Sequence, residues 1–389
     1  MKIFVLLSRF PYPLDKGDKL RAYYQIKELS AFHEIHLCCL DDTNIPSEYL
    51  KQLKAFCKSV NVIKLRKWQI AINLFTGLFS SLPFQVWYFY QGHAHRKIKE
   101  LIKNIQPDHI YCQLLRTAEY VKHEHAIPKT LDYMDTFSKG MERRIEHGGW
   151  KKPFIKSEFQ RLKKYENLIF EYFENKTIIS KQDQEFIFHP NRAKIAIIPN
   201  GIDLSKFTPL QIAKKYDLVF VGNMRYAPNV ESALFIVNEI LPILLQEKPD
   251  VKILLSGSSP AKAVLELASQ HVTVSGWVDD IRESYAKGRI FFAPLNIGTG
   301  LQNKLLEAMA MGIPCVTSSL ANNALKAADK KEILIGNTPE EYKNLILDLL
   351  SDIEKSNAIA EAGKKYVENT FNWTGSTQKL MNLIPYSLI

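Results

Sequence analysis

One stretch near residue 300 points most directly to the architecture of this chain: Ala293-Pro-Leu-Asn-Ile-Gly298-Thr299-Gly300-Leu301-Gln302-Asn303-Lys304-Leu305-Leu306-Glu307-Ala-Met-Ala-Met-Gly312-Ile-Pro314. An apolar run ends at Leu295, and two glycines then allow a tight turn. A helix is predicted from near Leu301, and Gly312 ends it before the next apolar run. This order of strand, glycine turn, helix and strand indicates a parallel sheet covered by helices.

The start of that helix has the chemistry of an anion site. Free backbone amides and the helix dipole both favour a negative charge there. Lys304 and Glu307 lie three residues apart on one helical face, so a diphosphate and a sugar diol could be bound together. The stretch alone also fits an ordinary strand–helix connection with a surface Lys–Glu pair.

Short apolar runs alternate with helical segments along the whole chain, which predicts two doubly wound α/β domains. Turn-forming residues are densest at 191–209, where we expect the domain junction. The predicted domains are 1–190, with a C-terminal helix at about 374–389 packing back on it, and 191–373. Such domains would face each other across a central cleft that receives the carboxyl ends of both sets of strands. The expected strands are Lys2–Ser8, Glu34–Leu40, Val60–Leu65, His109–Gln113, Thr130–Met134, Lys176–Ser180, Lys194–Ile198, Asp217–Val221, Val251–Ser256, His271–Val274, Arg289–Leu295, Pro314–Thr317 and Glu332–Ile335.

Composition narrows the class of protein. The 389 residues are 46% hydrophobic and 24% charged, which excludes a disordered or collagen-like chain. Five scattered cysteines, with no C-x-x-C pair, indicate neither a disulfide framework nor a zinc site, so a reducing cytoplasm is expected. Polar residues interrupt the longest apolar stretch, Trp68–Trp87, and no membrane-spanning helix is expected.

Further motifs follow in a consistent order. Near the middle are Ile197-Ile-Pro-Asn-Gly-Ile-Asp203, with Phe207 and Pro209, and Leu218-Val-Phe-Val-Gly222. Later come Val274-Ser-Gly-Trp-Val278-Asp-Asp280 and Phe371-Asn-Trp373, and Pro11-Tyr-Pro13 with Gly17 and Asp18 lies near the start. Together with the stretch around Lys304, this set resembles glycosyltransferase family 4 (group 1). Its members are retaining enzymes with two Rossmann-like domains, the GT-B architecture. The stretch from Gly222 to Asn229, combined with Asn303-Lys-Leu-Leu-Glu-Ala-Met-Ala, resembles the sugar transferases of bacterial exopolysaccharide clusters.

The resemblance implies a retaining hexosyltransferase that moves a sugar from a nucleoside diphosphate sugar to a glycan or lipid-linked glycan in surface polysaccharide biosynthesis. No metal or other cofactor is expected. The residues it assigns to the donor are Gly17, Asp18, Gly222, Asn223, Val278, Asp280, Gly298, Thr299, Gly300, Leu301 and Glu307.

This chain departs from the family pattern at three places. Thr299 stands where the first of two glutamates is usual. Asn223 and Pro228 replace an Arg and a Lys that bind the diphosphate, so Arg225 and Lys304 are the expected substitutes. Met134 stands near the place of a common His, which leaves Asp135 as the expected polar group nearest the acceptor, or as a cap of the next helix. The catalytic assignment is therefore Asp135, Arg225 and Lys304.

Two other functions compete with this one. A nucleotide-sugar epimerase has the same fold, and the net charge of +10 also suits a basic nucleic-acid-binding protein. No recognition motif supports the second, and we expect no nucleic-acid partner.

The charge is partly concentrated in 139–164, which holds nine Lys or Arg. A second feature is interpreted together with this charge. The spacing of Trp68, Ile72, Phe75 and Phe79 puts them on one helical face, after Arg66 and Lys67. This stripe fits either core packed on the sheet or an interfacial helix. The second interpretation predicts a cytoplasmic protein that is peripheral on the anionic inner face of the membrane.

Overall fold

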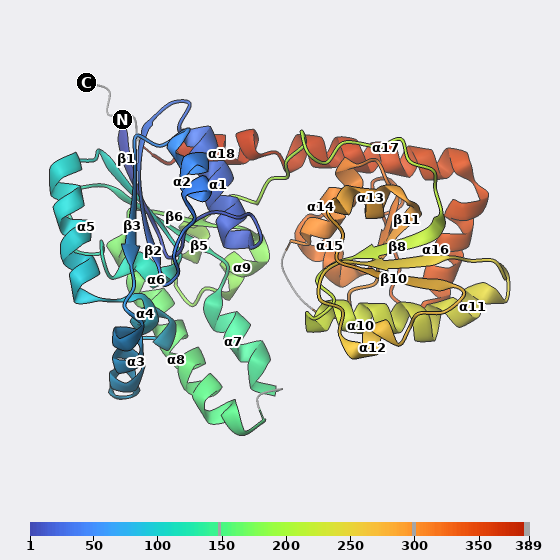
Figure 1. The fold of residues 1–389 in the computed structure, drawn as a ribbon, viewed down its shortest axis with the longest axis horizontal. Helices are drawn as coiled ribbons and strands as arrows, with labels where there is room; N and C mark the ends of the chain where they lie inside the picture. The colour runs from blue at the N-terminus through green and yellow to red at the C-terminus, as the bar shows by residue number, and fades with distance from the viewer. Residues whose placement is uncertain (147–148, 298–300, 385–389) are drawn as a thin grey trace. The chain divides into compact units, whose positions relative to one another are not determined.

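The computed structural model describes residues 1–146, 149–297 and 301–384. The chain forms two compact units, Met1–Asn200 with the C-terminal segment from Trp373, and Gly201–Asn372 (Figure 1). Each unit has its own parallel sheet and its own core, as the alternation of apolar runs and helical segments predicts.

The sheet of the N-terminal unit has the strand order β3-β2-β1-β4-β5-β6-β7. Alternate residues of β1 are buried on opposite faces, with Phe4 and Leu6 in one core cluster and Ile3, Val5 and Leu7 in another. A strand with helices on both sides has no solvent face, which explains its uninterrupted apolar sequence. The strands are β1 (Lys2–Leu7), β2 (Glu34–Asp41), β3 (Ser59–Lys64), β4 (His109–Gln113), β5 (Lys129–Met134), β6 (Asn175–Ile178) and β7 (Ala196–Ile197).

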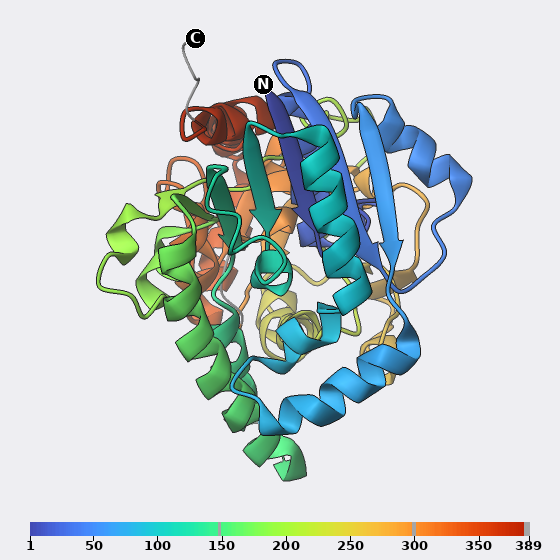
Figure 2. The ribbon, with the colours of Figure 1, turned by 90° about the vertical axis from the view of Figure 1, so that its left-hand side faces the viewer.

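Helices cover both faces of this sheet. Buried side chains of α1, α2 and α18 pack on one face, and those of α5 and α8 pack on the other, which is turned to the viewer in Figure 2. The ring of Trp373 in α18 stacks on Tyr24 in α1, with centroids 5.1 Å apart. The helices are α1 (Gly17–Leu29), α2 (Ser47–Lys54), α3 (Lys67–Thr76), α4 (Phe84–Phe89), α5 (Gly92–Ile105), α6 (Leu115–Ala118), α7 (Phe137–Glu146), α8 (Lys152–Ile169), α9 (Lys181–Phe186) and α18 (Trp373–Met381).

The sheet of the C-terminal unit has the strand order β10-β9-β8-β11-β12-β13, the doubly wound order in which β8 and β11 flank the switch point. The loops after these two strands are therefore where a ligand is expected. The strands are β8 (Tyr216–Val221), β9 (Ile253–Ser256), β10 (Val272–Gly276), β11 (Gly288–Ala293), β12 (Cys315–Thr317) and β13 (Leu334–Ile335).

The helices of this unit include one continuous run, Ala227–Leu245, made of α10 (Ala227–Phe235), a π-helical turn and α11 (Leu241–Leu245). By length and composition it is the one run among the described residues apolar enough to cross a membrane. Ala233, Ile236, Ile240 and Leu244 on this run lie in the core of the unit. The other helices are α12 (Lys262–Leu265), α13 (Ile281–Ala286), α14 (Asn303–Ala310), α15 (Ser319–Leu325), α16 (Pro339–Ser351) and α17 (Ile353–Thr370).

Two expectations need correction. The segment 191–200 was assigned to the second domain, but it belongs to the first unit, because β7 pairs with β6 and the Ile198 amide donates to the Ile178 carbonyl at 2.8 Å. The core interpretation of the Trp68 stripe is also wrong, since Trp68, Ile72, Phe75 and Phe79 are 60%, 51%, 65% and 85% exposed.

Candidate functional site

The loop after β8 in the C-terminal unit has a surface made of bare backbone. Gly222 and Gly257 approach so closely that a Cβ on Gly257 would lie 1.8 Å from the Gly222 carbonyl oxygen. Gly257 also has a φ of 137°, which side-chain-bearing residues rarely adopt. These two glycines therefore allow a close backbone approach between the loops at the carboxyl ends of β8 and β9, which a side chain on Gly257 would prevent.

A cavity of about 510 Å³ opens beside these glycines. Gly222, Val278 and Asp280, three of the predicted donor residues, line it together with Trp277 and Lys206. Asp280 also caps α13 by accepting the Arg282 amide at 3.0 Å, and it pairs with the Arg282 guanidinium at 2.6 Å. The hydrogen bonds from Arg282 lower the pKa of Asp280, so this carboxylate stays ionised at the cavity.

Asn223 organises the rest of the loop. Its side-chain oxygen accepts the Arg225 amide at 3.0 Å, and its carbonyl accepts the Asn229 side chain at 2.9 Å. The Arg225 side chain is exposed. Asn223 is thus part of the framework of the loop, and Arg225 is an exposed cation on its surface.

Lys304 lies at the start of α14, one residue after the helix begins. Its ammonium donates to the side-chain oxygen of Asn229 and lies 5.0 Å from the centroid of the Phe220 ring. Burial lowers the pKa of Lys304 to about 8, against a smaller opposing effect of Glu307. A partly desolvated ammonium of this kind interacts strongly with an anion that enters the site.

Glu307 follows one helical turn later. The buried Tyr285 hydroxyl donates to its Oε2 atom at 2.7 Å. Burial raises the pKa of Glu307 to about 7, whereas Tyr285, Lys206 and Lys304 act in the opposite direction. The carboxylate is therefore positioned by one hydrogen bond and keeps further acceptor positions for the hydroxyl groups of a ligand.

The predicted donor residues of the C-terminal unit are thus found in one region, apart from three that the structure does not describe. The helix that carries Lys304 and Glu307 also starts later than predicted. Gly298, Thr299 and Gly300 lie outside the described residues. Leu301 packs against the core of the unit, and α14 begins at Asn303, two residues after the predicted start.

Sequence reasoning missed three residues of this region. Asn229 holds the Lys304 ammonium, Tyr285 holds the Glu307 carboxylate, and Lys206 adds a cation to the cavity wall. Asn229 and Lys206 stand inside or beside motifs that carried the resemblance. Tyr285 gives no such signal, because a tyrosine in a short helix is indistinguishable from ordinary core.

In the N-terminal unit, the other predicted residues gather where β1, β4 and β5 end. Asp18 pairs with Arg9 at 3.3 Å, and a Cβ on Gly17 would meet the Met134 side chain at 3.3 Å. A cavity of about 460 Å³ lies at this edge of the sheet. Its lining combines four cations with aromatic rings and two carboxylates, and includes Arg9, Lys16, Lys19, Arg116, Phe84, Tyr88, Asp41 and Asp42.

Asp135 directly follows the bend that ends β5, where Met134 has a φ of 65°. Desolvation, followed by the charge of Asp183, raises the pKa of Asp135 to about 7. At the start of α7 it is Glu166 that accepts the Ser138 amide, at 2.9 Å. The capping role that was the alternative for Asp135 is therefore carried by a residue of α8.

Within residues 1–146, 149–297 and 301–384, no three His, Cys, Asp or Glu side chains are grouped in a way that could hold a metal ion. All five cysteines are buried and unpaired, and burial raises the pKa of the Cys38 and Cys112 thiols to about 12. These thiols are inert core groups.

Comparisons with known proteins place this geometry in context. Residues 215–352 match the family model described as glycosyl transferases group 1. An uncharacterised 44.6 kDa protein in the cps region of Klebsiella pneumoniae is 22% identical over 393 residues, covering 95% of this chain and 96% of that protein. A galactosyltransferase of Escherichia coli, named for UDP-Gal and GlcNAc-diphosphoundecaprenol, is 25% identical and covers 49% of this chain and 54% of that protein.

The fold has solved counterparts. The crystal structure of Anabaena HepE in complex with UDP superimposes with a TM-score of 0.67 at 15% identity, and covers 98% of this chain and 99% of that one. The GT-B architecture expected from the sequence is confirmed.

Proposed function

Because this chain carries a group 1 glycosyltransferase domain on a GT-B fold, we propose that it transfers a hexosyl group from a nucleoside diphosphate sugar to a glycan or lipid-linked glycan, with retention at the anomeric carbon. The pathway we propose is bacterial surface polysaccharide biosynthesis, on the cytoplasmic side of the membrane. The similarity to the cps-region protein over nearly its whole length supports this assignment.

The observation that carries the proposal is the pair formed by Lys304 and Glu307. Both lie at the start of α14, both are held by a side chain from another element, and the glycine-floored cavity is part of the same unit. An ammonium suits a diphosphate, and a carboxylate suits a ribose diol, one helical turn apart. A nucleoside diphosphate matches this order of charges.

The chemistry follows from where charge develops. In the transfer, the bond between the anomeric carbon and the diphosphate oxygen breaks, and a bond to the acceptor oxygen forms. The departing diphosphate gains negative charge, which Lys304, Arg225 and the amides that open α14 would stabilise. The acceptor proton leaves with the help of the donor phosphate, and Asp135 holds the acceptor hydroxyl. No metal ion takes part in the reaction we propose.

The acceptor is assigned to the N-terminal unit. The cavity that contains Arg9, Lys16 and Arg116 combines positive charge with aromatic surface. A glycan linked to lipid through a diphosphate offers both matching groups, since sugar rings stack on aromatic side chains and phosphates pair with cations. The E. coli relative named for a diphosphoundecaprenol acceptor is consistent with this choice.

The test is a thermal-shift screen of the full chain against UDP, GDP and other nucleoside diphosphates. A ligand that binds only the folded state raises the midpoint in proportion to the logarithm of its concentration. We expect one diphosphate to do so, and we expect Glu307→Ala to remove both the shift and most transfer activity without unfolding the protein. Glu361→Ala, an exposed glutamate of α17, is the matched control and should behave as the parent.

The same assay separates the competing functions. An epimerase would convert the nucleotide sugar into a second nucleotide sugar without any acceptor. A nucleic-acid-binding protein would bind polynucleotide with a steep salt dependence and ignore nucleoside diphosphates. Either result, without transfer, would overturn the proposal.

A further inference from the structure

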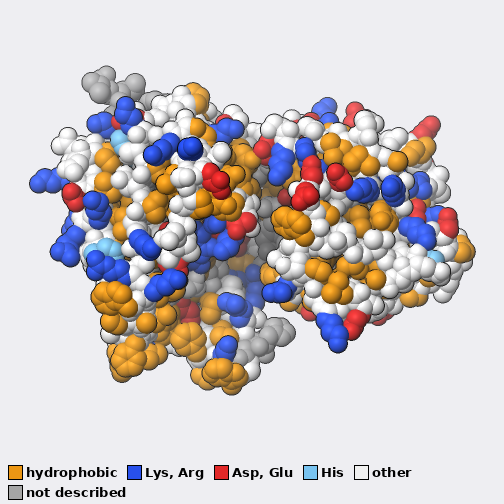
Figure 3. Space-filling model, in the orientation of Figure 1, with side chains coloured by type: hydrophobic (Ala, Val, Ile, Leu, Met, Phe, Trp, Pro, Cys, Tyr) orange, Lys and Arg blue, Asp and Glu red, His pale blue; other side chains and the backbone are white. Residues whose placement is uncertain are grey.

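The lower end of the N-terminal unit in Figures 1 and 2 is formed by α3 and by the region where α7 and α8 meet. Hydrophobic side chains gather at both places on the surface shown in Figure 3. Large apolar groups are rarely left in water in such number without a function. The exposed side chains are Trp68, Ile72 and Phe75 on α3, Leu78 and Phe79 in the turn that follows it, Trp150 just before α8 and Phe154 in its first turn.

The orientation of α3 is set from its other face. Ile70 and Asn73 are each only 8% exposed, and the Asn73 side-chain amide donates to the backbone carbonyls of Trp87 and Tyr90. A helix held in this way cannot turn its apolar stripe inward without breaking buried hydrogen bonds. The stripe is therefore a fixed outer surface of the unit.

The two apolar regions are held together. The Arg161 side chain in α8 donates to the carbonyl oxygens of Gly77, Leu78 and Leu82, which join α3 to α4. The rings of Phe84 and Phe154 also pack against each other, with centroids 4.6 Å apart. The two regions thus form one connected surface, which we call the apolar edge.

Positive charge surrounds the apolar edge. Lys151, Lys152 and Lys156 are exposed beside Trp150. Glu158, the nearest acidic residue in sequence, is withdrawn from the surface, since its carboxylate accepts the Phe84 amide at 2.8 Å and is buried. The surface beside Trp150 therefore presents these three cations without the Glu158 carboxylate.

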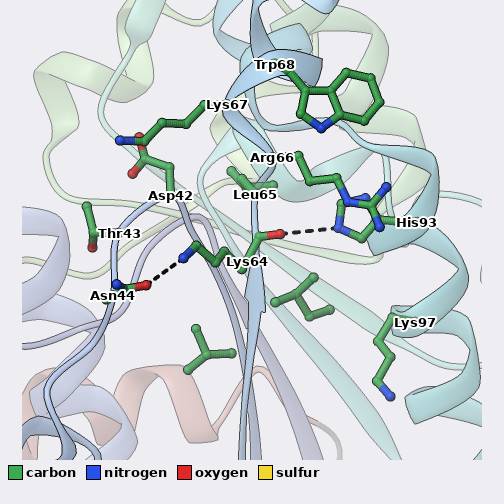
Figure 4. A pocket seen from close by; sticks show the side chains of 12 residues that line it. Asp42, Thr43, Asn44, Lys64, Leu65, Arg66, Lys67, Trp68, His93 and Lys97 are labelled. Atoms are coloured by element: carbon green, nitrogen blue, oxygen red, sulfur yellow. Dashed lines mark hydrogen bonds between the residues drawn. The ribbon is translucent and has the colours of Figure 1, made fainter.

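A cavity of about 960 Å³ joins the apolar edge at Trp68, as Figure 4 shows. Its cations come from the end of β3, the start of α3 and the residues between them, and from α5. Lys64, Arg66, Lys67 and Lys97 are all exposed. The Lys64 ammonium donates to the Asn44 side-chain oxygen at 2.6 Å, and the Lys97 ammonium lies 4.0 Å from Glu100. One carboxylate, Asp42, lies among them, and it already accepts the Tyr88 hydroxyl at 2.9 Å.

We propose that the N-terminal unit docks on an anionic bilayer, with the apolar edge inserted at the interface and a lipid phosphate seated in the cavity between Arg66 and Lys97. A phospholipid is the occupant we infer, because the cations of the cavity lie next to the apolar edge. A phosphate in the cavity leaves the acyl chains of the same lipid beside Trp68 and Phe75, where apolar side chains replace water. A free small anion would use the cavity alone and leave the apolar edge in water.

The test is flotation of the full-length protein with vesicles of phosphatidylcholine containing 30% phosphatidylglycerol. Binding should weaken with salt and be absent with phosphatidylcholine alone. The double variant Trp68→Ser, Phe75→Ser should lose binding by at least about tenfold. The variant Arg66→Gln, Lys97→Gln should lose about fivefold for each cation removed.

Matched controls come from the other unit. Ile353→Ser and Leu265→Ser remove side chains of similar exposure, 61% and 51%, and should bind within about twofold of the parent. Every variant should unfold at the same midpoint temperature as the parent, which shows that it is folded by a measurement that does not depend on the proposed function.

Three results would overturn the proposal. They are equal flotation with neutral vesicles, no flotation with anionic vesicles at low salt, and parent-like binding of the Trp68→Ser, Phe75→Ser variant. Inorganic phosphate at constant ionic strength should not release the protein from vesicles. If phosphate raises the unfolding midpoint through Arg66 and Lys97 while vesicles do not bind, the cavity takes small anions and the docking proposal is wrong.

Discussion

The guanidinium of Arg21 and the carboxylate of Asp132 form a two-point ion pair inside the N-terminal unit, with Nε–Oδ2 at 2.6 Å and Nη2–Oδ1 at 3.1 Å. Both side chains are fully buried. The remaining Nη1 donor reaches the Ile198 carbonyl and the Asn200 side chain at the end of the unit. The pair thus connects α1, the end of β5 and the last residues before Gly201. Asp132 lies three residues before Asp135 in the sequence.

Removing one partner of this pair should be costly. We expect Asp132→Ala to lower the free energy of unfolding by about 3–5 kcal/mol, because the Arg21 charge would be left buried and unpaired. Denaturant unfolding measures the change. Glu100→Ala removes one side of an exposed pair with Lys97 and should change stability by less than about 1 kcal/mol. Similar losses in the two variants would contradict the role given to the buried pair.

The affinity for a nucleoside diphosphate should depend on pH through both groups at the start of α14. The pKa of Glu307 is raised to about 7, so its carboxylate is protonated and lost as an acceptor below that pH. The pKa of Lys304 is lowered to about 8, so its charge is lost above that pH. Calorimetric titration should therefore find the tightest binding between these values. In a plot of affinity against pH, Glu307→Gln should flatten the decline on the acidic side, and Lys304→Arg should flatten the decline on the alkaline side. If both declines stayed as in the parent, the assignment would be wrong.

The same carboxyl group also links pH to stability. In the folded state the pKa of Glu307 is raised above 4.5, its ordinary value in the unfolded chain, so the folded protein holds this proton more tightly. Its contribution to stability is therefore complete below that value and is lost as pH rises toward 7. Glu307→Gln, which cannot ionise, should reduce this decline in thermal unfolding measurements of the ligand-free protein.

Lys304 should act mainly on turnover. We expect Lys304→Ala to lower kcat more than it raises KM, because charge on the diphosphate grows as the bond to the sugar breaks. Asn229→Ala should produce a weaker form of the same effect, since it frees the ammonium without removing it. If Lys304→Ala changed KM alone, the contact would be one of ground-state binding.

Gly257 should tolerate no side chain. A Cβ there would lie 1.8 Å from the Gly222 carbonyl oxygen on a backbone with a φ of 137°. Gly257→Ala should destabilise the C-terminal unit by at least about 3 kcal/mol and abolish the nucleotide-induced thermal shift. Gly140→Ala is the control, because nothing lies within 4 Å of its Cβ position in α7, and it should be neutral or stabilising by about 0.5–1 kcal/mol.

Asp135 should matter for transfer and not for donor binding. Asp135→Asn keeps the size of the side chain and is expected to lower kcat by at least about tenfold while the nucleoside diphosphate affinity stays unchanged. Asp250→Asn, at an exposed residue paired with Lys248, serves as the control. A loss of donor affinity in Asp135→Asn would contradict the separate roles given to the two units.

The secondary structure was largely readable along the chain. Each of the thirteen expected strands has a counterpart, because a strand buried on both faces is a short apolar run that needs no distant information. The spacing of Lys304 and Glu307 was equally local, since a helix places residues three apart on one face. The glycine turn at Gly222 was visible for the same reason.

Other features depended on partners far away in sequence. The strand expected at 194–198 joins the first sheet because residues 196–197 pair with β6. No local pattern reports which sheet a strand will join. Glu166 caps α7, and Tyr285 positions Glu307, through side chains that only the packing of separate elements brings within hydrogen-bond distance. The sequence left the stripe of α3 as either core or surface. The hydrogen bonds from the Asn73 side chain to the carbonyls of Trp87 and Tyr90 fix the orientation of the helix. Periodicity specifies that a helix has an apolar face; whether protein or solvent covers that face depends on what else the fold places beside it.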